Sequence, residues 1–195
     1  MAVTISALTP EQTQDATRLL ARAFVTNPLH VAVFGRDQIR ANEAFFRIGL
    51  TVMKGPKLAA LDDGRMLGVI HWVDAAKCQF STVEKVSMLP AMIRGLGLRS
   101  AMKVGTWLSI WAKHDPAEPH VHLGPIGVSP HAQGRGTGRQ LMDRYCQHLD
   151  ETSAAGYLET DRPGNVAFYE KFGFEVTETA TIHRVENFFM RRLVR

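Results

Sequence analysis

Apolar positions in the first half of the chain recur at the spacings of strands and helices in turn. Residues 3–8 alternate between apolar and polar and predict a first strand, and Pro10 and Glu11 then open a helix that ends before Pro28. A second helix is expected over 36–53. The run KLAALDDGRMLGVIHWV predicts a β-hairpin, because Asp63-Gly64 between two apolar runs is a strong turn signal.

The segment from Phe80 to Lys113 has a different composition. It is rich in methionine, leucine and tryptophan at helical spacing, is interrupted by glycine and proline, and carries almost only positive charges. We expect two or three short helices here, forming a helical insert at about 79–118. Such an insert could be a layer packed on a sheet, a wall of a substrate site, or the surface of a homodimer.

A regular order of elements follows in the last 76 residues of the chain, from His120 onward. The pattern predicts a strand over 120–128, a glycine-rich loop, and a helix from about 136 to 154. A strand over 157–161, a short helix over 163–172 and two final strands complete the order. Strands mixed with helices, with no repeat or linker, predict one α/β domain over residues 1–195.

Composition narrows the class of protein. The chain has 195 residues, of which 45% are hydrophobic and 22% charged, as in soluble globular domains. We expect a cytoplasmic protein, because no signal peptide or membrane-spanning run is evident and Cys78 and Cys146 look like free thiols. A net charge of +4 and a pI near 9.3 favour an anionic ligand. No nucleic-acid-binding signature accompanies this charge.

The stretch AQGRGTGRQL, residues 132–141, joins the strand HVHLGPIGV to the next helix and is suited to bind phosphate. The first N–H groups of a helix lack partners, and the helix dipole favours an anion there. A P-loop would need Lys and Ser or Thr after Gly138, where Arg139 and Gln140 stand. A dinucleotide fingerprint would need glycine in place of Arg139, so neither motif fits.

The loop does match Gln/Arg-x-x-Gly-x-Gly/Ala through Gln133, Gly136 and Gly138. In this it resembles the pyrophosphate-binding loop of the GNAT superfamily of acyl-CoA-dependent N-acyltransferases. The strand ends at VSP, as the family's fourth strand commonly does, and NVAFYEKFGF at 165–174 is similar to the family's Asn-x-x-x-Tyr-x-x-x-Gly-Phe. Within the superfamily, GVSPHAQGRGTG, LET and FYEKFGF are similar to puromycin-type antibiotic N-acetyltransferases.

The resemblance implies the GNAT fold, a mixed and mostly antiparallel sheet that splays at its centre, with helices on both faces. It also implies acetyl-CoA as the acyl donor. The residues that it implies in binding this donor are Ile126, Gly127, Val128, Gln133, Gly134, Arg135, Gly136, Thr137, Gly138, Arg139, Asn165 and Tyr169. Tyr169 is implied to protonate the leaving thiolate. A backbone N–H at 126–128, beside a bulge that Gly124-Pro125 favours, would bind the oxyanion.

Transfer to an amine also requires a group that removes a proton, since the pKa of a free amine is about 10. His122 stands where several members of the family carry a glutamate base, and Glu159 lies in mid-strand, an unfavourable place for a carboxylate unless it faces a site. His122, Glu159 or water alone could therefore be the base. His120 and His122 could bind a metal together with His114 or Asp115, but no second spaced pair supports this, and we expect none.

We therefore expect an N-acetyltransferase that acts on a primary amine, most simply that of a small molecule. The alternatives are a non-catalytic acyl-CoA-binding or sensing module and a protein N-acetyltransferase. Retention of Asn165 and Tyr169 beside the phosphate loop favours an enzyme. Residues 25–53 and 79–118 should shape the acceptor site, and their positive charge argues mildly against a polycationic acceptor such as an aminoglycoside.

Overall fold

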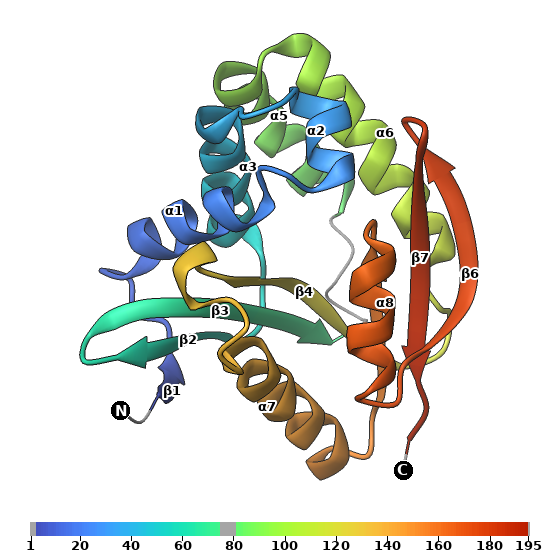
Figure 1. Cartoon of the computed structure of the whole chain (residues 1–195). Helices are drawn as coiled ribbons and strands as arrows, with labels where there is room; N and C mark the ends of the chain where they lie inside the picture. The colour runs from blue at the N-terminus through green and yellow to red at the C-terminus, as the bar shows by residue number, and fades with distance from the viewer. Residues whose placement is uncertain (1–2, 75–80, 195) are drawn as a thin grey trace.

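One central sheet organises the chain (Figure 1). The structure, a computed structural model, describes residues 3–74 and 81–194. Within them, seven strands pair in the order β1-β2-β3-β4-β5-β7-β6. Only β4 and β5 run parallel; the other neighbours are antiparallel. The strands are β1 (Thr4–Ala7), β2 (Lys57–Asp62), β3 (Arg65–Asp74), β4 (His120–Val128), β5 (Ala155–Thr160), β6 (Glu175–Ile182) and β7 (Val185–Arg192). The predicted mixed, mostly antiparallel α/β fold is confirmed.

Helices lie on both faces of this sheet. They are α1 (Thr13–Phe24), α2 (Pro28–Phe34), α3 (Ile39–Val52), α5 (Thr82–Leu96), α6 (Leu98–His114), α7 (Thr137–Glu151) and α8 (Pro163–Glu170), with a short 3-10 turn, η1 (Pro130–Ala132). In Figure 1, α1 lies above β3 and β4 and α7 below them, while α2, α3, α5 and α6 gather at one end. None of the helices in the described ranges has both the length and the apolar composition needed to cross a bilayer.

The largest apolar core lies between the sheet and α7. Tyr145 of α7 is fully buried there, and its hydroxyl donates to the carbonyl of Val121 on β4 at 2.6 Å. Cys146 is partly buried against the same core, as its place on the apolar side of the helix predicts. Cys78 lies outside the described residues.

The β2–β3 hairpin forms as the turn signal predicts. Asp63 and Gly64 both have positive φ, 48° and 75°, which is the requirement of the two-residue turn whose twist matches the strands. Strand β3 of this hairpin reaches the centre of the sheet, where it pairs with β4.

Two helical predictions were incomplete. Helix α2 was not predicted, because Pro28 was interpreted as the end of a helix. Pro28 instead occupies the first turn of α2, where a missing N–H costs nothing. The segment 82–114 forms two long helices instead of two or three short ones, since Pro90 and Gly105 are accommodated inside them. The one break is at Gly97, whose φ of 76° ends α5.

The sheet opens between β4 and β5. These strands pair only over 120–122 and 155–157, so the edge of β4 beyond His122 has no strand beside it on that side. On its other side β4 pairs with β3. This pairing contains a bulge, at which Gly124 and Pro125 lie opposite His71. A Cβ on Gly124 would lie 2.2 Å from Nδ1 of His71, so only glycine fits. The expected splay and bulge are confirmed.

Candidate active site

A cavity of about 730 Å³ occupies the opening between β4 and β5. The glycine-rich loop, α8 and residues of α1, α3 and α6 all contribute to its lining. His122 and Glu159 also line it, at the point where the two strands separate. A cavity of this size can hold the reactive end of a cofactor together with a second small molecule.

The loop presents backbone N–H groups to this cavity. Gly134 and Gly136 have φ of 75° and 85°, a conformation that residues with a side chain seldom adopt. The side-chain amide of Gln133 donates to the carbonyl of Val128 at 3.2 Å and so connects the loop to the end of β4. No side chain caps the start of α7, which leaves its first N–H groups to bind an anion.

Most residues predicted to bind the cofactor line the cavity. They are Ile126, Gly127, Val128, Gln133, Gly134, Gly136, Gly138, Arg139, Asn165 and Tyr169. Arg135 and Thr137 are not among the lining residues: Arg135 is exposed, and the Thr137 side chain is buried toward Gly68 of β3. The buried side chain leaves Thr137 only its backbone N–H as a candidate ligand, whereas contact of the exposed Arg135 guanidinium with a phosphate stays a prediction.

Tyr169 and Asn165 lie one turn apart on α8, on the cavity side. The side-chain amide of Asn165 donates to Oγ1 of Thr160 at 3.2 Å, which ties the helix to the end of β5. Tyr169 is 6% exposed. Burial, and secondly the negative charge of Asp161, raise the pKa of its phenol above the usual value, so the hydroxyl keeps its proton at neutral pH.

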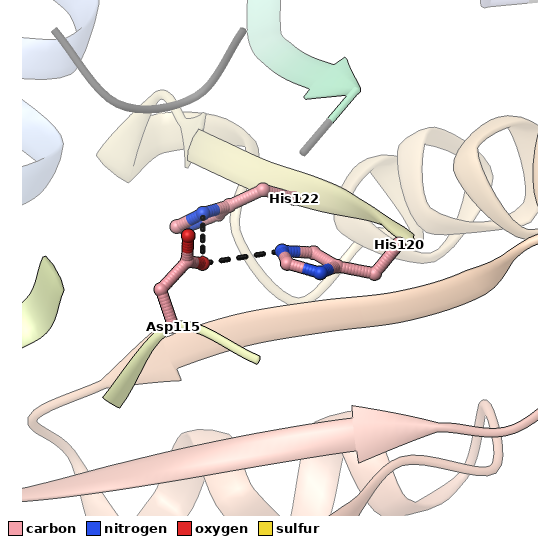
Figure 2. A group of neighbouring side chains, drawn as sticks. All are labelled: Asp115, His120 and His122. Atoms are coloured by element: carbon pink, nitrogen blue, oxygen red, sulfur yellow. Dashed lines mark hydrogen bonds and ion pairs between the residues drawn. The ribbon is translucent and has the colours of Figure 1, made fainter. Parts of the chain in front are cut away.

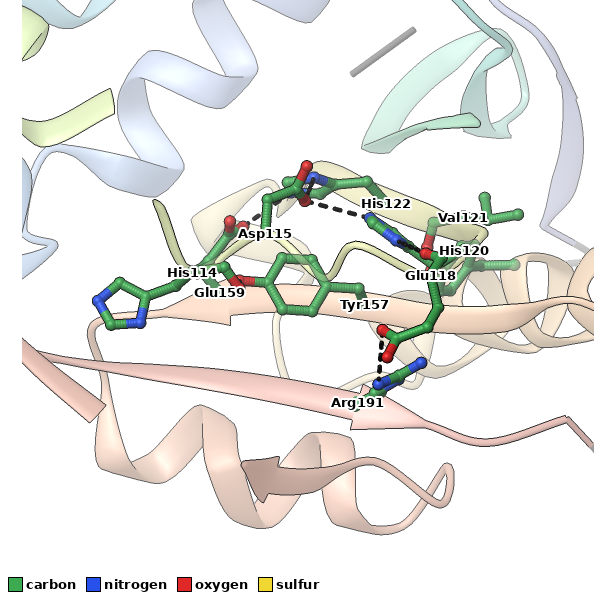
Figure 3. A network of polar contacts seen from close by, with 10 residues as sticks. His114, Asp115, Glu118, His120, Val121, His122, Tyr157, Glu159 and Arg191 are labelled. Atoms are coloured by element: carbon green, nitrogen blue, oxygen red, sulfur yellow. Dashed lines mark hydrogen bonds and ion pairs between the residues drawn. The ribbon is translucent and has the colours of Figure 1, made fainter. Parts of the chain in front are cut away.

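His122 and Glu159 form a close pair at the splay. Nε2 of His122 lies 2.8 Å from Oε2 of Glu159, and the Glu159 side chain is only 3% exposed (Figure 3). The second carboxylate oxygen, Oε1, is buried and accepts no hydrogen bond from the described residues. A buried carboxylate oxygen beside a cavity is an unfavourable arrangement without a donor, and it points to a ligand that brings one.

A second carboxylate approaches His122 from the other side. Oδ1 of Asp115 lies 3.5 Å from Nδ1 of His122 and 3.1 Å from Nε2 of His120 (Figure 2). Nδ1 of His120 in turn contacts the carbonyl of Glu118 at 2.8 Å. The ligand-type atoms of these three side chains lie within 4.8 Å of one another, a spacing that a metal would also allow. These contacts between imidazole nitrogens and a carboxylate form without a metal, and the absence of a resident metal stays a prediction.

His114 does not join this group, although the sequence left it open as a metal ligand. Its ring stacks on Phe189 with centroids 4.1 Å apart, and its Nδ1 contacts the carboxylate of Glu178. The next residue, Asp115, is the one whose side chain meets His120 and His122.

Sequence reasoning missed several polar residues of the cavity wall, among them Asp161 and His71. Asp161 accepts hydrogen bonds from the N–H of Leu29 at 2.7 Å and the amide of Asn27 at 3.3 Å, and so anchors α2 to the end of β5. His71 lines the cavity opposite the bulge; its Nε2 contacts the carbonyl of Lys54, and burial lowers its pKa to about 4. The available signals were the two-residue spacing of Glu159 and Asp161 and a lone histidine in an apolar strand.

Comparison with known proteins identifies the family. The model of the Acetyltransferase (GNAT) family matches residues 54–174, which is most of the chain and includes the loop, β4, β5 and α8. The chain belongs to the GNAT acetyltransferase family. The predicted superfamily is thus confirmed, and members of this GNAT family use acetyl-CoA as the acyl donor.

Similarity to particular GNAT proteins is partial in sequence and complete in fold. A mycothiol acetyltransferase from Streptomyces avermitilis is 32% identical over 84 residues, which make up 42% of this chain and 26% of that protein. The chain thus matches about a quarter of the length of these curated relatives.

Solved structures extend the likeness to the whole chain. The structure described as histone acetyltransferase HPA2 and related acetyltransferase, from Corynebacterium glutamicum, superposes with a TM-score of 0.76 at 19% identity, covering 100% of this chain and 98% of that one. Arylalkylamine N-acetyltransferase 2 from Aedes aegypti gives 0.69 at 12% identity and covers 100% of both chains. At these identities the likeness concerns the fold.

Proposed function

We propose that this GNAT protein transfers the acetyl group of acetyl-CoA to the primary amine of a small molecule. The observation that carries the proposal is that a phosphate-binding loop, a protonated phenol and a buried carboxylate–imidazole pair all line one cavity. Each of the three suits a different part of this reaction, and a protein that only bound acyl-CoA would need the first alone.

The glycine loop would hold the pyrophosphate of acetyl-CoA. The free N–H groups at the start of α7 and the guanidinium of Arg139 suit its negative charge. The pantetheine arm would then follow the open edge of β4, where backbone groups beyond His122 have no strand to pair with. This course brings the thioester to the middle of the cavity, near 126–128.

The amine would be bound and deprotonated at Glu159 and His122. Oε1 of Glu159 can accept a hydrogen bond from an incoming ammonium, and His122 can take a proton directly or through water. Carboxylates on both sides of the ring, Glu159 and Asp115, stabilise the positive charge that His122 then carries. Sequence alone left these two residues as competing bases, and their contact favours a joint role.

Acetyl transfer then proceeds by attack of the neutral amine nitrogen on the thioester carbon. A C–N bond forms, and the negative charge on the former carbonyl oxygen is met by a backbone N–H at 126–128. When the intermediate collapses, the C–S bond breaks, the sulfur leaves as thiolate, and the nitrogen would lose its second proton to water. The Tyr169 phenol, which its raised pKa keeps protonated at neutral pH, would donate its proton to that sulfur and regain one from water.

One structural neighbour supports the class of acceptor. The Aedes aegypti neighbour bears the name of an amine acetyltransferase, which is consistent with a small amine as acceptor. The similarity of the FYEKFGF and loop motifs to puromycin-type enzymes stays a prediction, as do a cytoplasmic location and a single domain. A homodimer also stays a prediction.

An acceptor screen with thiol release as the readout tests the proposal. We expect CoA release that requires both acetyl-CoA and a small primary amine, with the N-acetylated amine identified by mass spectrometry. Tight acetyl-CoA binding without amine-dependent release would indicate a binding or sensing module. Acetylation of peptides but of no small amine would indicate a protein N-acetyltransferase.

A further inference from the structure

One wall of the cavity is formed by aromatic rings from three helices. We call this surface the aromatic wall, and it consists of Phe24, Phe45, Phe46, Trp107 and Trp111. The rings form a continuous series in which neighbouring centroids lie 5.0–5.4 Å apart, from Phe24 through Phe46 and Phe45 to the tryptophans. Phe45 stacks on Trp107 at an interplanar angle of 14°. Such mutual packing makes the wall rigid and apolar.

A histidine that packs among these rings adds no charge to the wall. His30 is 3% exposed, and its ring packs against those of Phe45, Phe46 and Trp107. Its Nδ1 contacts Oδ1 of Asn42 at 2.6 Å, and the Asn42 amide donates to the carbonyl of Gln38. Burial lowers the pKa of His30 to about 4, so the ring is neutral at pH 7.

The charged side chains that line the cavity can accept one ammonium group. Among the described residues, its carboxylates are those of Glu159 and Asp161. Asp161 is already engaged by Leu29 and Asn27, whereas Oε1 of Glu159 is not engaged. Arg162 also lines the cavity, and its positive charge would repel a polycation.

We propose that the acceptor is a primary amine with a single positive charge, borne on an apolar body large enough to contact the aromatic wall. This rests on the proposed function and names its substrate class. The amine would meet Glu159 and His122, and the ring or alkyl body would lie against Phe45 and Trp107. Diamines, polyamines and aminoglycosides would have to bury a second ammonium against apolar surface, which is strongly unfavourable.

Two matched pairs of amines test the proposal on the wild-type protein. Pentylamine and 1,5-diaminopentane differ by one terminal amine, and 2-phenylethylamine and ethylamine differ by one ring. We expect kcat/KM for pentylamine to exceed that for the diamine at least about 10-fold, and the ring to raise kcat/KM about 10–100-fold. A preference for the diamine, or no gain from the ring, overturns the substrate class while leaving acetyl transfer intact. Failure to acetylate any amine overturns the proposed function itself.

A negative charge placed beside the aromatic wall gives a second test. Leu108 of α6 lines the cavity and is half-buried, whereas the next residue, Ser109, is exposed and does not line it. Leu108→Glu should raise the ratio of kcat/KM for 1,5-diaminopentane over pentylamine about 10-fold or more. Ser109→Glu adds the same charge outside the cavity and should leave the ratio unchanged. An unchanged ratio in folded Leu108→Glu protein, or an equal change in both variants, contradicts the proposal; should Leu108→Glu not fold, the wild-type pairs decide.

Discussion

Nε2 of His122 and Oε2 of Glu159 lie 2.8 Å apart, although 37 residues separate them along the chain. The first stands at the last residue of β4 that pairs with β5, and the second stands on β5 just beyond that pairing. The separation of the two strands therefore places an imidazole and a carboxylate together at the mouth of the opening.

This contact predicts that the two residues act as a unit. His122→Ala should lower kcat/KM for amine acetylation about 10²–10⁴-fold and displace the acidic limb of its pH profile, because the group that accepts the proton is lost. Glu159→Gln should give a loss of similar kind. In a double-mutant cycle, the two losses should be far from additive. A near-normal rate with an unchanged pH profile in His122→Ala would leave deprotonation to water.

The loop predicts selective stabilisation by CoA. At a concentration one hundred times its Kd, CoA should stabilise the wild-type protein by about 2.7 kcal/mol and raise the Tm accordingly, with NAD and ATP much less effective. Gly136→Asp should abolish this shift, because it puts negative charge where the pyrophosphate is proposed to bind. Gly64→Asp is the matched control, since Gly64 also has positive φ and open space but lies in the β2–β3 turn. An undiminished CoA shift in Gly136→Asp would refute the assignment of the loop.

The buried histidines predict a loss of stability on acidification. In the unfolded chain His30 binds a proton near pH 6.5, but in the folded protein only near pH 4. Between these values the unfolded state holds more protons, so the free energy of unfolding falls as the pH falls, by roughly 1 kcal/mol per pH unit for this residue. Above pH 6.5 the contribution is absent.

Urea denaturation between pH 7 and pH 4.5 measures this slope. His30→Gln, which keeps a donor for Asn42, should flatten the slope by the amount given, while the exposed His131→Gln should not change it. Equal slopes in wild type and His30→Gln would mean that the His30 ring titrates normally in the folded protein. His71, with a pKa also lowered to about 4, is expected to account for much of the slope that remains.

Local patterns were sufficient for much of the fold. Asp63-Gly64 alone predicts the hairpin turn. The glycines at 134 and 136 mark the loop before α7, and both have a positive φ there. The helix α2 escaped prediction because its seven residues are too few for an apolar periodicity and are held by Asp161, far along the chain. Contacts of that range have no local signature.

Some parts of the candidate site could likewise be predicted from local sequence, and others could not. The phosphate loop and the Asn165–Tyr169 pair are contiguous motifs and could be found in the sequence. The aromatic wall could not, because Phe45 and Trp107 meet only through the packing of α3 and α6 against the open end of the sheet. Likewise, sequence offered His122 and Glu159 as alternatives, and only the neighbouring strands show that they touch.

Tyr169 provides the most direct test that this cavity performs acetyl transfer. Tyr169→Phe keeps the ring and its packing on α8 and removes only the hydroxyl, which acts mainly in the transition state. Acetyl-CoA affinity and the single-turnover rate of amine acetylation should be measured side by side for both proteins. We expect affinity within a few-fold of wild type and a rate lower by about 10–10³-fold. A full single-turnover rate in Tyr169→Phe would contradict the account, because no other described group has been assigned to protonate the leaving thiolate.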